Sequence, residues 1–256
     1  MRQLTAFIKK EWTEQVRTGR LTILLILFVL FGIMNPAVAK LTPWMMSLFA
    51  DSLADTGMIV TEVTVNALTS WTQFYKNVPM ALIVFVLLFS GTLTGEYQKG
   101  TLVNMLTKGL GRWKVILAKG LVMVLTWTVC YFLCYGITLA YNVYFWDNSI
   151  VPNLFFGPVC LYLAGIWVIS LVLLMSSVFG NSSSVLIGTG GVFALAYVAG
   201  MIPALKKFVP VKLMDSSGLL LGAAPAGEYT WAVVVTLILS VAGVALAVVC
   251  FNRRAV

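Results

Sequence analysis

Residues 158–179 read PVCLYLAGIWVISLVLLMSSVF, and this run of 22 residues contains no Asp, Glu, Lys or Arg. A helix of that length extends about 33 Å, which matches the roughly 30 Å thickness of the hydrocarbon core of a bilayer. A helix on the surface of a soluble protein would need polar residues on its solvent-exposed face. The run therefore predicts a helix that crosses a membrane.

Five further runs of the same character occur along the chain. They lie at residues 21–39, 78–94, 121–141, 184–202 and 231–251, and none of them contains an acidic or basic residue. Hydrophobic residues make up 60% of the 256 residues and charged residues only 10%, too few to cover the surface of a soluble domain. We therefore predict an all-α integral membrane protein with six transmembrane helices, in a single domain over residues 1–256.

The distribution of basic residues predicts the side of the membrane on which each segment lies. Six crossings place both termini on one side; if that side is the cytoplasm, the inner segments hold 12 Lys and Arg residues and the outer segments hold 5. Basic residues accumulate in cytoplasmic loops. We predict a multi-pass protein of the cell membrane with cytoplasmic termini, whose net charge of +8 reflects its orientation in the lipid bilayer rather than binding to nucleic acid.

Residues 1–20 predict an amphipathic helix ahead of the first crossing. Its apolar and polar side chains gather on two faces: Leu4, Phe7, Ile8, Trp12 and Val16 on one, and Lys9, Lys10, Thr13 and Arg17 on the other. A helix of this kind lies in the headgroup layer. The first run ends in Ala37-Val38-Ala39, which is similar to a signal-peptidase site, but the long leader and its acidic residues favour a retained span.

Two segments on the outer side, residues 40–77 and 203–230, are long enough to fold. In the first, Leu68, Trp71 and Tyr75 have helical spacing, which is compatible with a short helix lying on the membrane. The second contains Pro and Gly residues that break a long helix, and its apolar residues could dip into the interface as a partial re-entrant segment. For both segments an ordinary ordered loop is the alternative.

The chain lacks the residues that most enzymes and ion-coupled carriers need. It contains no His and no G-x-x-x-x-G-K-[ST] phosphate-binding loop. Its four cysteines, Cys130, Cys134, Cys160 and Cys250, lie in apolar runs, where they behave as small hydrophobic residues. We predict no catalytic, cofactor or metal site. Because no span contains an ionisable residue of the kind that proton- or sodium-coupled carriers use, energy for uphill transport would have to come from another polypeptide.

The most informative segment is residues 95–119, GEYQKGTLVNMLTKGLGRWKVILAK, between the second and third runs. Lys99 and Gly100 predict a break, after which Thr101 would cap a short helix over residues 102–107. Residues 108–111, Lys-Gly-Leu-Gly, would end that helix. A basic loop without a function is the alternative, but it would not require a capped start or apolar residues inside a short helix.

This segment resembles the signature of the type-2 family of ATP-binding-cassette (ABC) export permeases, written here as E-x-x-x-G-T-L-x-x-x-L-T-x-x-x-x-R-x-x-x-x-x-x-K. Many members have Pro where this chain has Gly109. The motif covers about 25 of the 256 residues, while the predicted topology is similar throughout. The residues that we expect to take part in coupling are the eight motif positions and Lys99: Glu96, Lys99, Gly100, Thr101, Leu102, Leu106, Thr107, Arg112 and Lys119.

The resemblance implies a permease that is not itself an enzyme. In that family the short cytoplasmic helix is a coupling helix that docks on a separate ATPase subunit, and the N-terminal helix is an interfacial "elbow". ATP and Mg²⁺ are then expected on the ATPase, which is present in two copies. A second permease subunit, the same chain or a related one, would complete the complex, and the cargo would be exported by ATP-driven alternating access.

By the same resemblance, the translocation path lies between the second and fifth spans of the two subunits. The candidate residues are Phe85, Phe89, Thr92, Thr189, Phe193 and Tyr197, for which plain packing inside the membrane is the alternative. Close helix contacts are expected at Gly91, Gly95, Ser184, Gly188 and Gly191. An aromatic and hydroxyl lining would suit a peptide, an antibiotic, a drug-like molecule or a lipid.

Three other functions compete with export. A passive channel or facilitator would need no ATPase. A membrane-embedded enzyme would need a nucleophile and a base, and the pair Asp51 and Asp55 in an outer segment is better explained as solvated charge. A complex of the same family with a sensing or mechanotransmission role is compatible with every residue named above.

Overall fold

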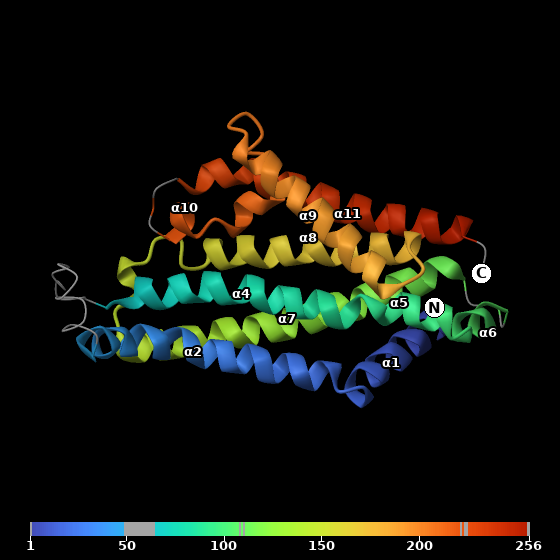
Figure 1. Cartoon of the computed structure of the whole chain (residues 1–256), viewed down its shortest axis with the longest axis horizontal. Helices are drawn as coiled ribbons and strands as arrows, with labels where there is room; N and C mark the ends of the chain where they lie inside the picture. Colours follow the sequence, from blue (N-terminus) through green and yellow to red (C-terminus); the bar gives the residue numbers. More distant parts are fainter. Residues whose placement is uncertain are drawn as a thin grey trace.

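The computed structural model describes residues 2–48, 65–107, 109, 111–220, 222 and 225–254. The regular elements in these residues are helices (Figure 1). The α-helices are α1 (Arg2–Arg17), α2 (Arg20–Leu48), α4 (Ala67–Phe89), α5 (Gly91–Gln98), α6 (Thr101–Thr107), α7 (Arg112–Phe145), α8 (Phe156–Val178), α9 (Ser182–Met201), α10 (Ser216–Leu220) and α11 (Thr230–Arg253). The short 3₁₀ helices are η1 (Asn148–Ile150), η2 (Pro210–Met214) and η3 (Ala226–Tyr229).

Six helices are long and apolar enough to cross a membrane, which confirms the predicted all-α fold with six spans. Five of the spans are α2, α7, α8, α9 and α11, the last extended at its start by η3. The second span is formed by α4 and α5 together, from Ala67 to Gln98. Each predicted run lies within its helix apart from a terminal residue, and several helices extend well beyond the apolar run.

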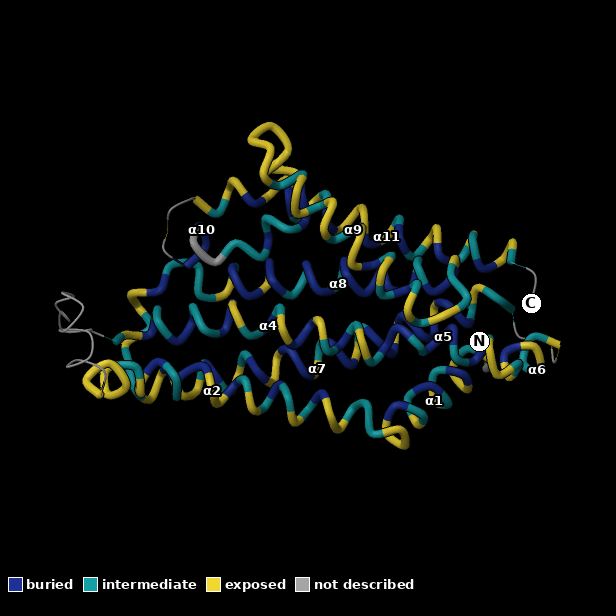
Figure 2. The backbone as a smooth tube through the Cα atoms, in the orientation of Figure 1, coloured by how far each residue is buried: buried dark blue, intermediate teal, exposed yellow. Residues whose placement is uncertain are grey.

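The spans differ sharply in how far the rest of the chain covers them. α7 and α8 lie in the middle of the bundle; α2 packs against α4 and α7, and α11 packs against α8 and α7. α9 packs mainly along α8 and slants across it (Figure 1). The most apolar membrane-length window of α8 is 67% buried and that of α9 only 11% buried, so exposed residues follow most of α9 in Figure 2.

The predicted surface helix around Trp71 is instead the first part of α4. Asn66 caps the helix, since its Oδ1 accepts a hydrogen bond from Thr69 N at 3.3 Å. Trp71 and Phe74 are buried, and their rings lie 5.4 Å and 6.1 Å from the ring of Tyr135 on α7. These aromatic contacts extend α4 beyond the apolar run that begins at residue 78.

Three neutral polar side chains hold α2, α4 and α7 together in the half of the bundle away from α6. The buried Asn35 donates a hydrogen bond to Thr138 Oγ1 at 3.0 Å and accepts one from Asn77 Nδ2 at 2.7 Å. Thr138 in turn donates to Gly32 O at 3.2 Å. Such bonds between membrane helices fix the register of their packing.

The segment after α9, which is predicted to lie on the outer side, folds back over α8. Leu213 of η2, Leu219 of α10 and Tyr229 of η3 are buried, and they form a small second core with Cys160 and Ala164 of α8. Lys212 donates to Glu228 O at 3.0 Å and so joins η2 to η3. The described part of this segment is therefore ordered against the bundle, while its partial re-entrant placement remains a prediction.

Candidate coupling site at the α6 end of the bundle

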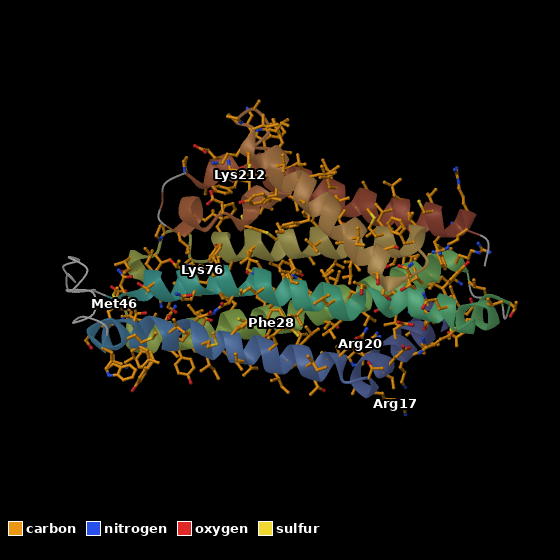
Figure 3. All side chains as sticks on the ribbon, viewed as in Figure 1. Arg17, Arg20, Phe28, Met46, Lys76 and Lys212 are labelled. Atoms are coloured by element: carbon orange, nitrogen blue, oxygen red, sulfur yellow. The ribbon has the colours of Figure 1, made fainter. Side chains whose placement is uncertain are left out.

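The first helix, the end of the last helix and α6 all lie at the same end of the bundle (Figure 1). Arg17 and Arg20 mark the turn between α1 and α2, whereas Lys76 and Lys212 lie toward the opposite end (Figure 3). All residues proposed for coupling belong to segments at the α6 end. The arrangement agrees with the predicted topology, in which the termini and residues 95–119 share one side.

Two glycines set α6 apart from the spans on either side, as the sequence predicts. Gly100 and Gly109 adopt φ angles of 66° and 85°, a left-handed backbone that glycine adopts without a steric penalty. The helix begins at Thr101, one residue earlier than predicted. The Thr101 hydroxyl donates to Glu96 O at 3.2 Å and so ties α6 back to α5.

The side chains of α6 divide into an inner and an outer face. Leu102 is completely buried in the core of the chain, and Leu106 is partly buried against that core. Val103 is 39% exposed, and Thr101 and Thr107 are also exposed. Leu102, one of the residues expected to take part in coupling, therefore faces the bundle and anchors α6 on it.

Behind α6, a buried lysine joins three helices. Lys119 of α7 lies 2.9 Å from Glu11 Oε2 on α1 and 2.9 Å from Glu96 Oε2 on α5. It also donates to Thr92 O at 3.2 Å. All three charged residues are buried. Removing one member of a buried ion pair leaves an uncompensated charge, so each partner becomes necessary to the other.

A second lysine extends this group, which we call the ion-pair network: Lys10, Glu11, Glu14, Glu96 and Lys119. Lys10 Nζ lies 2.8 Å from Glu14 Oε2 and 2.9 Å from Glu11 Oε1, and it also contacts Glu96 Oε1. Burial lowers the pKa of Lys10, but hydrogen bonds with the three carboxylates outweigh burial and hold the pKa well above its usual range. Burial raises the pKa of Glu14, and Lys10 overcomes this effect and lowers the pKa.

The same carboxylates have the spacing of a possible cation site, but lysines already fill it. Oxygens of Glu11, Glu14 and Glu96 lie within 4.8 Å of one another. The ammonium groups of Lys10 and Lys119 contact these carboxylates and leave a net charge of only about −1 for the group. The chemistry therefore favours an ion-pair network over a metal centre.

Two arginines connect the start of α7 with the ends of α8 and α11. Arg112 donates to the carbonyls of Phe251 at 3.4 Å and Asn252 at 3.1 Å, and also to that of Arg254. Arg254 donates to Ser177 O at 3.2 Å and Phe179 O at 2.9 Å. These carbonyls lie at helix C-termini, where a cation is favoured by the helix dipole.

The predicted path residues fall into two groups. Phe85 and Phe89 are buried inside this chain with ring centroids 4.3 Å apart, and Phe85 packs edge-on against Trp127 at 5.7 Å. Thr92 lies beside the ion-pair network, because its carbonyl accepts a hydrogen bond from Lys119 and its hydroxyl accepts one from Arg20 at 3.4 Å. For Phe85 and Phe89 the packing alternative is therefore the one that the structure supports.

The other three path residues line an open apolar groove between α4 and α9. Thr189 and Phe193 lie with Leu82, Ile83 and Leu186 around a cavity of about 310 Å³. An adjoining cavity of about 490 Å³, lined by Phe193 and Tyr197, reaches Lys206, Lys212 and Asp215. The Thr189 hydroxyl is buried and has no hydrogen-bond partner within the described residues. We call the two cavities together the α4–α9 groove.

The comparison with known families agrees with this geometry. The family described as ABC-2 family transporter protein matches residues 5–256. The chain belongs to the ABC-2 transporter family. It is therefore a multi-pass transmembrane permease subunit of an ABC transporter, not itself catalytic, and its family works in general with a partner ATPase. No curated protein matches the sequence.

In this ABC-2 permease the structure brings together some of the predicted coupling residues and adds others. Glu96 and Lys119 form an ion pair, and Gly100, Thr101 and Leu102 position α6. Lys99 is exposed and Arg112 is engaged at the end of α11. Glu11 and Arg254 were not among the predicted coupling residues. The sign of a role for Glu11 in the sequence is that it interrupts the apolar side of the amphipathic helix.

Proposed function

We propose that this chain is the membrane half of an exporter driven by a separate cytosolic ATPase. Two ATPase subunits would bind ATP and Mg²⁺ and dock on α6 of two permease subunits. Closure of the ATPase pair would move α6 and switch the permease between inward-open and outward-open states. The observation that carries this proposal is a short helix with an exposed face, bounded by Gly100 and Gly109 and bonded through Thr101 to α5, which the ion-pair network joins to α1 and α7.

The contacts of α6 suit it to transmit a displacement to the helices that it touches. Leu102 inserts into the core, and Thr101 is bonded to the last turn of α5. Glu96, four residues before Gly100, forms part of the ion-pair network with α1 and α7. A displacement of α6 would therefore be passed to the second span, the third span and the elbow helix together, rather than lost in a loop.

The α4–α9 groove supports pairing with a second permease subunit. α9 exposes most of its length, including Ile187, Leu195 and Val198. An apolar helix face beside a groove is available for a second copy or a related chain. A path built there would present Thr189, Phe193 and Tyr197, which suits export of an apolar or amphipathic cargo such as a peptide, an antibiotic, a drug-like molecule or a lipid.

A co-purification experiment tests the coupling assignment. The tagged full-length chain is expressed in its native cell, extracted in mild detergent and assayed for a bound ABC ATPase and for ATP hydrolysis. We expect Val103→Asp and Thr107→Asp to lose the ATPase, because both positions lie on the exposed face of α6. The control is Leu205→Asp, an exposed apolar position in the segment between α9 and η2.

Folding must be followed in the same samples. We expect the Val103 and Thr107 variants to unfold at the temperature of the parent protein, whereas Leu102→Asp, which buries a charge, should unfold earlier. Retention of the ATPase by the Val103 and Thr107 variants, at the level of the Leu205 control, would contradict docking on α6.

A further inference from the structure

A second groove lies on the other flank of the bundle, where the elbow helix crosses the spans. It has a volume of about 380 Å³ and is lined by side chains from α1, α7, α8 and α11, among them Ile8, Leu121, Ile169 and Val244. The two serines in its lining, Ser170 and Ser240, both donate to carbonyls of their own helices at 2.7 Å. The groove therefore offers its occupant an apolar surface.

One basic residue, Lys114, lies beside the part of the groove lined by Leu4 and Leu117. Lys114 lies one helical turn before Leu117, which lines the groove, so both face the same side of α7. Lys114 Nζ donates to Gln3 Oε1 at 2.7 Å, and Gln3 directly precedes the lining residue Leu4. Trp113, a residue type enriched at the membrane interface, is exposed beside this position.

The positive charge of Lys114 is not compensated by the described part of the chain. No carboxylate among the described residues pairs with Lys114. The segments predicted to be cytoplasmic contain only three acidic residues, Glu11, Glu14 and Glu96, and all three are engaged by Lys10 and Lys119. A second copy of this chain would have no further acidic residue on that side to offer.

An occupant that is apolar along its length and anionic at one end complements both features. We propose that this groove binds an acyl chain of an anionic phospholipid of the inner leaflet, with the phosphate held at Lys114. Basic pockets between membrane helices on the cytoplasmic side bind such headgroups. The lipid would rest under the elbow helix, between Ile8 and the spans, and so join α1 to α8 and α11. The proposal does not depend on the ATPase.

The experiment uses the purified full-length chain, stripped of lipid in detergent, and measures its thermal unfolding midpoint with added phosphatidylglycerol, phosphatidylcholine or glycerol phosphate. We expect phosphatidylglycerol to raise the midpoint most and glycerol phosphate, which has no acyl chain, to leave it unchanged. In Lys114→Gln the affinity for phosphatidylglycerol should fall about fivefold, as expected for one basic side chain at an anionic surface. Lys9→Gln, which removes an exposed charge from the elbow helix, is the control.

The groove itself is tested by filling it. Val244→Trp should abolish stabilisation by phosphatidylglycerol, whereas Val241→Trp, on the exposed side of the same helix, should preserve it. Because a tryptophan in the groove could itself change the midpoint, phosphatidylglycerol bound per chain is also counted by native mass spectrometry. Equal stabilisation by both phospholipids, or equal lipid binding in the Val244 and Val241 variants, would overturn the proposal.

Discussion

α8 and α9 are consecutive in the chain and pack against each other, yet they differ greatly in how far the rest of the chain buries them. α8 is surrounded by α7, α9, α11 and η2, and 67% of its membrane-length window is buried; for α9 the figure is 11%. Both helices are apolar and free of charge. Hydrophobicity alone therefore decides that a helix enters the membrane, while its neighbours decide whether it meets protein or lipid.

The α6 end of the bundle and the α4–α9 groove differ in the same way, since the first is tightly joined and the second is open. At the α6 end, α1, α5 and α7 are joined by buried ion pairs and helix-capping arginines. Along the α4–α9 groove, by comparison, the Thr189 hydroxyl has no hydrogen-bond partner among the residues that the structure describes, and much of α9 is exposed. A permease needs both: a part that moves as one body with the ATPase, and a face that a second subunit and a cargo can complete.

The largest effect is expected from a substitution that disrupts the ion-pair network at the α6 end. Lys119→Met would leave Glu11 and Glu96 buried without their shared lysine, although Lys10 would still contact both. Breaking a buried ion pair costs about 3–5 kcal/mol, so we expect a large loss in the free energy of unfolding in detergent. The matched control is Lys99→Met, an exposed lysine near the same end. Similar unfolding of the two variants would show that the network does not stabilise the fold.

Two glycine substitutions sharpen the comparison between α8 and α9. A Cβ atom at Gly165 of α8 would lie 2.3 Å from Trp127 Cζ2, so Gly165→Ala should destabilise the protomer by about 1–3 kcal/mol. A Cβ at Gly190 of α9 meets no described atom within 4 Å, so Gly190→Ala should be neutral or stabilising by up to about 1 kcal/mol. Thermal or denaturant unfolding of the isolated protomer measures both.

Dimer formation is a second measurement that distinguishes Gly165→Ala from Gly190→Ala. If α9 faces another permease subunit, Gly190→Ala should weaken the dimer seen by size-exclusion chromatography without lowering protomer stability. A protomer destabilised as much by Gly190→Ala as by Gly165→Ala would show that α9 is packed as tightly as α8, contrary to the structure.

The sequence predicted the spans well because a bilayer imposes a length and a lack of charge that can be read locally. It underestimated α4, whose first turns contain the polar residues Gln73, Lys76 and Asn77 among the aromatic ones. Asn77 is accommodated by Asn35, 42 residues away, and Trp71 by η1 and α7. Local hydrophobicity could not reveal these partners.

The candidate site was predictable only where a turn or a cap is local. The breaks at Gly100 and Gly109 follow from glycine itself. The pairing of Lys119 with Glu11 joins residues 108 positions apart, and it depends on the angle at which α1 meets α7. The burial of Phe85 and Phe89 likewise depends on which face of α4 meets α7. A sequence motif gives no information on how α4 is rotated about its own axis.

The smallest expected effect lies at the edge of the ion-pair network. Glu14 pairs with Lys10 one turn away on α1, at 2.8 Å, but its side chain is 35% exposed, so water and salt screen the pair. We expect Glu14→Gln to lower the free energy of unfolding by only about 0.3–0.5 kcal/mol at neutral pH and low salt. Glu228→Gln, whose carboxylate is 57% exposed and 3.9 Å from Lys212, is the control and should have no measurable effect.

The pH dependence of that small difference identifies its cause. Lys10 holds the pKa of Glu14 below its ordinary value, so the stabilisation is present above the pKa of Glu14 in the unfolded chain and is lost as pH falls through the pKa in the folded chain. The parent protein and Glu14→Gln should thus differ at pH 7 and converge in acid, where the protonated Glu14 resembles Gln. A difference that persists at low pH would mean that Glu14 stabilises the fold through packing. Glu11 and Glu96 would then be the only carboxylates of the network that act through their charge.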